Sequence, residues 1–146
     1  MAFVDVGSSD DVQFRFYYVN MAVGKNAPNR KDDVMLVQYM LKRIYEKPVY
    51  ERGTLSTQQS VMVVDGLLGP ITIQWIVRFQ MDTRRLGMSC AVDGRVDRAS
   101  LGPYTITHIN YAFKRHYPEI HEKMPVHPDV PPEIRAALLL SPGALG

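Results

Sequence analysis

The chain has 146 residues, of which 46% are hydrophobic and 22% are charged, and its formal net charge at pH 7 is +2. This composition is typical of one folded domain and excludes global disorder, and the small net charge without a run of Lys or Arg excludes an electrostatic nucleic-acid binder. The single cysteine, Cys90, excludes an intramolecular disulfide and a cysteine-rich zinc site.

Residues 1–30 are predicted to form a strand and a loop that extend the main domain. Residues 12–19 begin with alternating apolar and polar side chains and are rich in β-formers, which predicts a strand that pairs with residues 21–23 as a small ribbon. Gly, Asn and Pro in residues 24–30 predict a loop. Residues 1–10 lack both the basic and the continuous apolar segment of a secretory signal.

The first predicted helix covers residues 33–46. Its apolar residues recur at helical spacing, and Asp32 or Asp33 is expected to cap its first amides. Pro48 ends this helix, and the polar residues 51–60 predict a loop.

The second predicted helix runs from Pro70 to about Arg85. Pro70 suits the first helical position because its missing N–H is not needed there. The helix is apolar on more than one side, so we expect the N-terminal strand or the C-terminal tail to pack over it. Trp75 on this helix is expected to belong to the core rather than to form a platform for a sugar.

The third predicted helix covers about residues 105–116 and places three large apolar side chains on one face. Residues 118–146 are rich in proline and predict a tail with one short helix over residues 133–140. Residues 31–117 then form the helical core of a single domain, and no part of the chain is long and apolar enough to cross a membrane.

An Asp-Gly pattern occurs twice, as V-D-G-L-L-G-P-I-T at residues 64–72 and as V-D-G-R-V-D-R-A-S at residues 92–100. In both copies a small hydroxyl residue follows six positions after the Gly. Gly can adopt the positive φ that a tight turn requires, and the Asp carboxylate can accept hydrogen bonds from loop amides. The repeat therefore predicts a structural role in two turns for Asp65, Gly66, Gly69, Thr72, Asp93, Gly94 and Ser100.

The two turns stand in a longer pattern over residues 31–102. A helix with Val37-Gln38 precedes the first turn, and a helix that contains Phe79-Gln80 precedes the second. These elements, in this order, resemble the peptidoglycan-binding domain family, whose three-helix modules are often attached to cell-wall hydrolases. The second copy departs from the family pattern because Asp97 stands where the family has a second Gly.

The resemblance implies a mainly α fold, a three-helix bundle of the peptidoglycan-binding type with a short N-terminal β element and an extra C-terminal helical tail. It also implies non-catalytic binding of peptidoglycan by a stand-alone module that needs no cofactor. Muropeptides offer carboxylates, amides and sugar hydroxyls, which arginine, amide and aromatic side chains recognise. The candidate ligand-binding residues are therefore Gln38, Tyr39, Gln80, Arg95, Arg98 and Tyr104.

Three histidines near the C-terminus, His116, His121 and His127, lie close in sequence to several carboxylates and raise the alternative of a zinc site in an amidase- or peptidase-like enzyme. No two of them have the spacing that would place both on one helix face, and Pro118 separates the first from the others. We therefore expect exposed loop histidines without a metal. No carboxylate pair, Cys-His pair or Ser-His-Asp signature indicates catalysis, and we expect no enzyme.

A second interpretation is a protein-interaction or structural adaptor that reuses the same fold. The N-terminal strand and the proline-rich tail would then form its contact surface, with the strand adding to a strand of a partner protein or of a second copy. Because no signal peptide is present, we expect a cytoplasmic protein as synthesised. A wall-binding module would then reach the periplasm or the wall through a bacterial or phage lysis or secretion apparatus, or through a partner.

Overall fold

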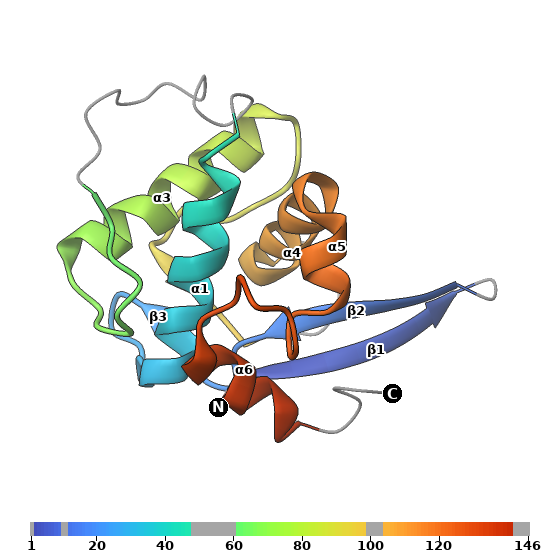
Figure 1. Cartoon of the computed structure of the whole chain (residues 1–146). Coiled ribbons are helices and arrows are strands. Elements are labelled where there is room, and N and C mark those ends of the chain that lie inside the picture. Colours follow the sequence, from blue (N-terminus) through green and yellow to red (C-terminus); the bar gives the residue numbers. More distant parts are fainter. Residues whose placement is uncertain (1, 10–11, 48–60, 99–103, 142–146) are drawn as a thin grey trace.

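The computed structural model describes most of the chain, and within that part the protein is mainly helical, with five helices and two small two-stranded sheets (Figure 1). Pro48, the loop predicted at residues 51–60 and Ser100 lie outside the described residues. The described residues are 2–9, 12–47, 61–98 and 104–141.

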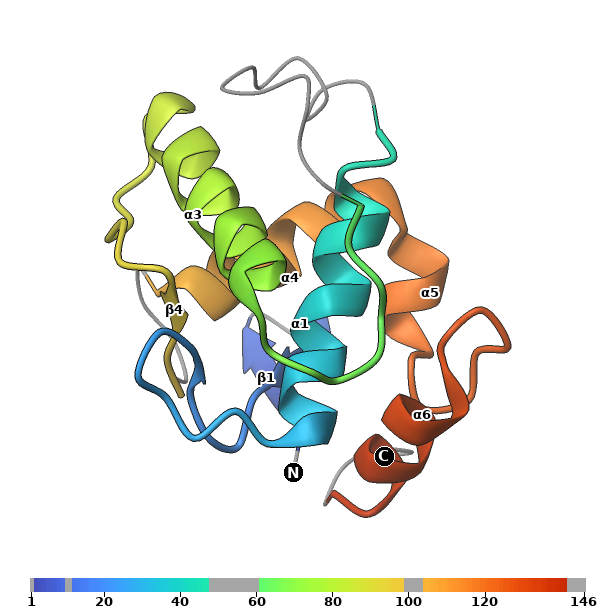
Figure 2. The ribbon, with the colours of Figure 1, turned by 90° about the vertical axis from the view of Figure 1, so that its left-hand side faces the viewer.

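Three helices form the centre of the molecule: α1 (Lys31–Ile44), α3 (Pro70–Arg85) and α4 (Thr105–His116). The predicted bounds of α3 and α4 are confirmed, and α1 begins and ends two residues earlier than expected. Helix α1 contacts both α3 and α4 (Figure 2). The apolar stripes of the three helices meet in one core. Burial of these stripes supplies most of the stability of the helices. Fully buried core residues include Leu36, Met40, Ile76, Phe79, Ile109 and Phe113.

The acidic residues at the start of α1 do not cap it, contrary to the prediction. The N-cap position is Arg30, which makes no side-chain cap bond. The buried Asp33 carboxylate instead accepts hydrogen bonds from the backbone amides of Asn20 (2.9 Å) and Met21 (3.1 Å), and burial raises its pKa. The chain before α1 folds back over the start of the helix. The Asn20 and Met21 amides therefore bond to the Asp33 carboxylate, which the sequence predicts as a cap for the first amides of the helix.

Residues of the N-terminal extension form a β-hairpin. Strands β1 (Phe3–Ser9) and β2 (Val12–Tyr18) pair antiparallel, with Phe3 opposite Tyr18 and Ser9 opposite Val12. The predicted strand at residues 12–19 is confirmed, but its predicted pairing with residues 21–23 is wrong. Strand β3 (Val23–Gly24) pairs instead with β4 (Arg95–Val96), because the turn after β2 carries the chain to the second Asp-Gly motif.

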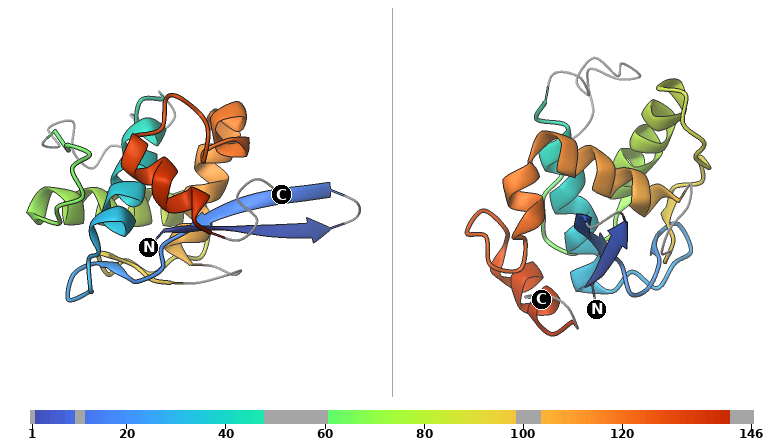
Figure 3. Two further views of the ribbon diagram at one scale, coloured as in Figure 1. Left: turned by 60° about the horizontal axis from the view of Figure 1, so that its bottom comes forward. Right: turned by 90° about the vertical axis from the view of Figure 1, so that its right-hand side faces the viewer.

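The base of the hairpin is anchored in the core, and its far half projects from the body of the protein (Figure 3). The Asn110 side chain accepts a hydrogen bond from Tyr17 N (2.8 Å) and donates one to Tyr17 O (2.9 Å). These are the two bonds that a third antiparallel strand would make with Tyr17. On the other edge, Val4 N donates to the Ser141 hydroxyl at 3.2 Å. Helix α4 and the C-terminal segment therefore hold both strands at their base.

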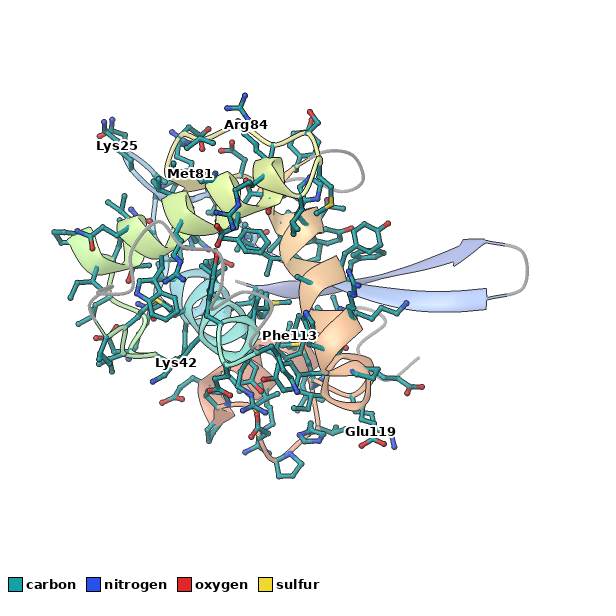
Figure 4. All side chains as sticks on the ribbon, turned by 90° about the horizontal axis from the view of Figure 1, so that it is seen from above. Lys25, Lys42, Met81, Arg84, Phe113 and Glu119 are labelled. Atoms are coloured by element: carbon teal, nitrogen blue, oxygen red, sulfur yellow. The ribbon has the colours of Figure 1, made fainter. Side chains whose placement is uncertain are left out.

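The prediction that the N-terminal strand or the C-terminal tail covers α3 is wrong. The hairpin packs chiefly against α4, α5 (Pro118–Glu122) and α6 (Pro132–Leu139). Helix α3 keeps Ile71 and Met81 exposed, and Met81 lies on the outer side of the helix, away from the core residue Phe113 (Figure 4). Trp75 is half-buried against the core, with its ring perpendicular to that of Tyr45 at 5.6 Å.

The C-terminal segment returns along α1. The predicted short helix is confirmed within one residue as α6, whereas the additional helix α5 begins at Pro118, which the sequence interpretation treated only as a break. Tyr117 donates a hydrogen bond to Arg43 O at 2.9 Å, and Tyr39 donates one to the Asp129 carboxylate at 2.6 Å. No helix in the described part of the chain is long and apolar enough to span a membrane.

Candidate binding site

The first Asp-Gly turn is built around the side-chain amide of Gln38 in α1. Gln38 Oε1 accepts hydrogen bonds from Asp65 N (3.1 Å) and Gly66 N (2.8 Å). Gln38 Nε2 lies 3.3 Å from Asp65 Oδ1, 3.1 Å from Leu67 O and 3.0 Å from Thr72 Oγ1. The Gln38 side chain is 1% exposed, so one buried amide organises the turn that precedes α3.

The second turn repeats this arrangement around Gln80 in α3. Gln80 Oε1 accepts from Asp93 N and Gly94 N, both at 3.0 Å. Gln80 Nε2 lies 2.9 Å from Asp93 Oδ1, 2.8 Å from Arg95 O and 3.0 Å from Thr105 Oγ1. The sequence repeat is therefore a repeat of structure, in which a helix supplies a Gln and the next helix supplies a Thr. Thr105 gives Gln80 the hydroxyl contact that Thr72 gives Gln38.

Both turns require glycine after the aspartate. Gly66 has φ +76° and Gly94 has φ +72°, in the left-handed region that glycine adopts without strain. A Cβ at Gly66 would also lie 2.7 Å from Lys31 O, so the first turn rests directly on the start of α1. The predicted roles of Asp65 and Asp93 are seen as well, because Asp65 Oδ1 accepts from Leu67 N (2.9 Å) and Asp93 Oδ1 accepts from Arg95 N (3.0 Å).

The two turns differ in what lies beside them. Strand β3 pairs with the second turn, where Lys25 N donates to Gly94 O and a Cβ at Gly24 would fall 2.1 Å from the same oxygen. No strand of the described residues pairs with the first turn, and a hollow of about 270 Å³ opens beside it. Strand β3 of the N-terminal extension therefore covers the second turn, and no strand of the described residues covers the first.

The hollow beside the first turn is lined mainly by aliphatic side chains from residues 61–63 and from the turn itself. Val61, Val63 and Leu67 are 78%, 60% and 67% exposed, whereas Met62 between the two valines is buried. The hollow can thus accept an apolar group of a ligand. Its lining residues are Gln38, Val61, Met62, Val63, Asp65, Leu67, Leu68, Gly69, Pro70, Ile71 and Thr72.

The six residues predicted to bind ligand do not form one site. Gln38 lies at the first turn, and Gln80 and Arg95 lie at the second. The amides of Gln38 and Gln80 are buried and already bonded to the turns, so they hold the site rather than contact a ligand. Tyr39 is buried on another side of α1 against Asp129, and burial raises the pKa of its hydroxyl.

The remaining predicted residues are on the surface. The guanidinium of Arg95 lies 3.2 Å from the Asp97 carboxylate and donates to Asn26 O at 3.4 Å. Arg98 and Tyr104 are exposed. The exposed residues of the hollow, Val61, Val63 and Leu67, were missed by sequence reasoning, although their apolar character beside an Asp-Gly turn was a usable signal.

The three histidines occupy separate surroundings. His121 is buried, bonds through Nε2 to Asn110 Oδ1 at 3.1 Å and packs edge-on against the Tyr17 ring, and burial lowers its pKa to about 3. This position corrects the expectation of an exposed loop histidine. His127 Nδ1 accepts from Asp129 N at 3.1 Å, and partial burial lowers the pKa of His116. Within the described ranges, no group of three His, Cys, Asp or Glu side chains is placed to hold a metal ion.

Comparison of the chain with protein families, with curated proteins and with solved structures finds no match.

Proposed function

We propose that the chain is a non-catalytic module that binds cell-wall glycopeptide at the hollow beside the first Asp-Gly turn. The observation that carries this proposal is the asymmetry between two equivalent turns: strand β3 pairs with the second, whereas a hollow opens beside the first and no strand of the described residues pairs with it. The order helix, Gln-anchored turn, helix, Gln-anchored turn, helix supports a fold of the peptidoglycan-binding three-helix type for α1, α3 and α4. Delivery to the wall by a phage or secretion apparatus remains part of this proposal.

Co-sedimentation with isolated sacculi tests the proposal. We expect saturable pelleting of the wild-type protein that persists at moderate salt, where attraction between exposed charges is screened. Leu67→Asp places a charge at the rim of the hollow and is expected to weaken binding about tenfold, the equivalent of about 1.4 kcal/mol.

The matched control is Val126→Asp, at an exposed apolar residue (52%) outside the lining of the hollow, and it should bind as the wild type does. Equal binding by both variants would place the contact elsewhere. Failure of the wild-type protein to pellet would contradict the proposed function itself.

The projecting hairpin favours a second candidate function, that of a protein-interaction adaptor. Each strand of β1–β2 pairs only with the other in the described part of the chain. Because Tyr17 turns its N–H and C=O toward Asn110, alternate residues of β2 also turn theirs to the outer edge, and these are Gln13 and Arg15. Such an edge is a template for an added strand.

Sedimentation over a range of protein concentrations tests the adaptor function in the form of self-association. We expect a dimer that Gln13→Pro abolishes, because proline removes an outward N–H without removing a bond between β1 and β2. Deletion of the hairpin is unsuitable, since its base is part of the core. A wild-type protein that stays monomeric at every concentration would contradict pairing with a second copy.

A further inference from the structure

We infer that the part of the wall recognised at this hollow is the peptide stem, held as an extended segment beside residues 61–64, and not the glycan strand. This inference rests on the proposed function and names the chemical group that the site would take. It follows from three properties of the hollow: the chemistry of its lining, the backbone of residues 61–64 and the charge beside the turn.

The lining is unsuited to a sugar. The described residues that line it include no aromatic ring on which a sugar face could stack and no arginine or lysine. Both acceptor positions of Gln38 Oε1 are taken by Asp65 N and Gly66 N, and its Nε2 protons are shared among three acceptors, one of which is the Thr72 hydroxyl. Sugar hydroxyls would therefore lose bonds to water and find few partners, which disfavours their burial here.

Residues 61–64 have the burial pattern of a strand without a sheet. Met62 points into the core, while Val61 and Val63 on either side of it are exposed. This alternation is that of a half-buried strand. No strand of the described ranges pairs with the segment, and an extended peptide laid beside it would bind by the main-chain hydrogen bonds of strand addition. The methyl groups of Val61, Val63 and Leu67 then suit the alanine methyl groups of a stem peptide.

A lysine lies against the same turn. A Cβ at Gly66 would fall 2.5 Å from Lys31 Cγ, which shows that the Lys31 side chain packs along the turn. Lys31 is exposed and forms no ion pair with another described residue. Stem peptides carry free carboxylates, which the Lys31 ammonium can attract. The exposed Asp65 carboxylate of the same turn would repel them, so Lys31 is the residue of this turn that favours an acidic ligand.

Three binding mixtures distinguish binding to the peptide stem from binding to the glycan strand. The full-length protein is mixed with intact sacculi, with glycan strands from which an amidase has removed the stems, and with intact sacculi plus soluble stem tetrapeptide as competitor. We expect binding to intact sacculi, at least about tenfold weaker binding to the stripped glycan, and competition by the soluble stem. Lys31→Glu should weaken binding to intact sacculi, whereas Lys25→Glu, an exposed lysine at the second turn, should not.

Equal binding to intact and stripped preparations, without competition by the stem, would overturn this inference and leave wall binding in place. Equal binding by wild type and Lys31→Glu would remove the proposed charge contact. Absence of binding to intact sacculi is a different result, because it contradicts the proposed function and the inference together.

Discussion

Replacement of Gln80 with Glu is expected to lower the free energy of unfolding by about 3 to 5 kcal/mol. The Glu side chain has the same shape, and one of its oxygens can still accept from Asp93 N and Gly94 N. Its other oxygen would replace Nε2, which now lies within 3.0 Å of three acceptor oxygens. A buried charge that faces the Asp93 carboxylate and the Arg95 carbonyl is costly, because each lost bond leaves a desolvated group without a partner and the Thr105 hydroxyl alone can donate to it. Chemical denaturation near pH 7 measures the effect.

The matched control is Gln74→Glu, which makes the same change at an exposed position of the same helix and should alter stability by less than about 0.5 kcal/mol. Gln38→Glu should behave like Gln80→Glu, because the first turn has the same set of bonds. If Gln80→Glu unfolded at the same denaturant concentration as Gln74→Glu, the second turn would not depend on the Gln80 amide.

Lowering the pH from 7 to 5 is expected to remove about 2 kcal/mol of stability through His121 alone. Burial lowers the pKa of His121 to about 3 in the folded protein, against about 6.5 in the unfolded chain. The unfolded chain therefore binds more protons between these values, so the stability is fully present above pH 6.5 and is lost as the pH falls toward 3. The loss should loosen the hairpin first, since His121 contacts both Asn110 and Tyr17.

Comparison with His121→Gln at each pH isolates this contribution, because glutamine can donate to Asn110 but does not titrate. The raised pKa of Asp33 acts in the opposite sense, with stability lost as the pH rises through the folded value, and it is present in both proteins. We expect the variant to lose about 2 kcal/mol less than the wild type between pH 7 and pH 5. Parallel slopes for wild type and His121→Gln would show that His121 is protonated without unfolding.

The helices could be predicted because their signals are local. Pro70 and the apolar spacing after it define α3, and the face with Ile109 and Phe113 defines α4. Strand pairing is not local: Asn110 and Ser141, both far along the chain, hold β2 and β1 respectively. The prediction that Asp33 caps α1 is wrong for the same reason. A carboxylate bonds to whichever amides the fold brings to it, and here these come from Asn20 and Met21.

Only part of the candidate site could be predicted, for a similar reason. The repeat identified both turns, but it did not identify Thr105, at the start of α4, as the hydroxyl partner of Gln80. The amides of Gln38 and Gln80, which the sequence interpretation predicts as ligand contacts, bond instead to the turns. The sequence of a helix gives no sign of which groups surround a glutamine amide. The pairing of β3 with the second turn is a contact between segments far apart in the chain, which no local pattern records.

The anchoring of the hairpin determines the order in which the protein can fold during synthesis. Tyr17 and Asn110 are 93 residues apart, and Val4 and Ser141 are 137 apart. At ribosomal rates of about 5–20 residues per second, the first strands leave the ribosome on the order of ten seconds before their supports exist. The hairpin is thus completed by segments that are made much later, and a chain whose synthesis stops before α4 has two strands and no surface to hold them.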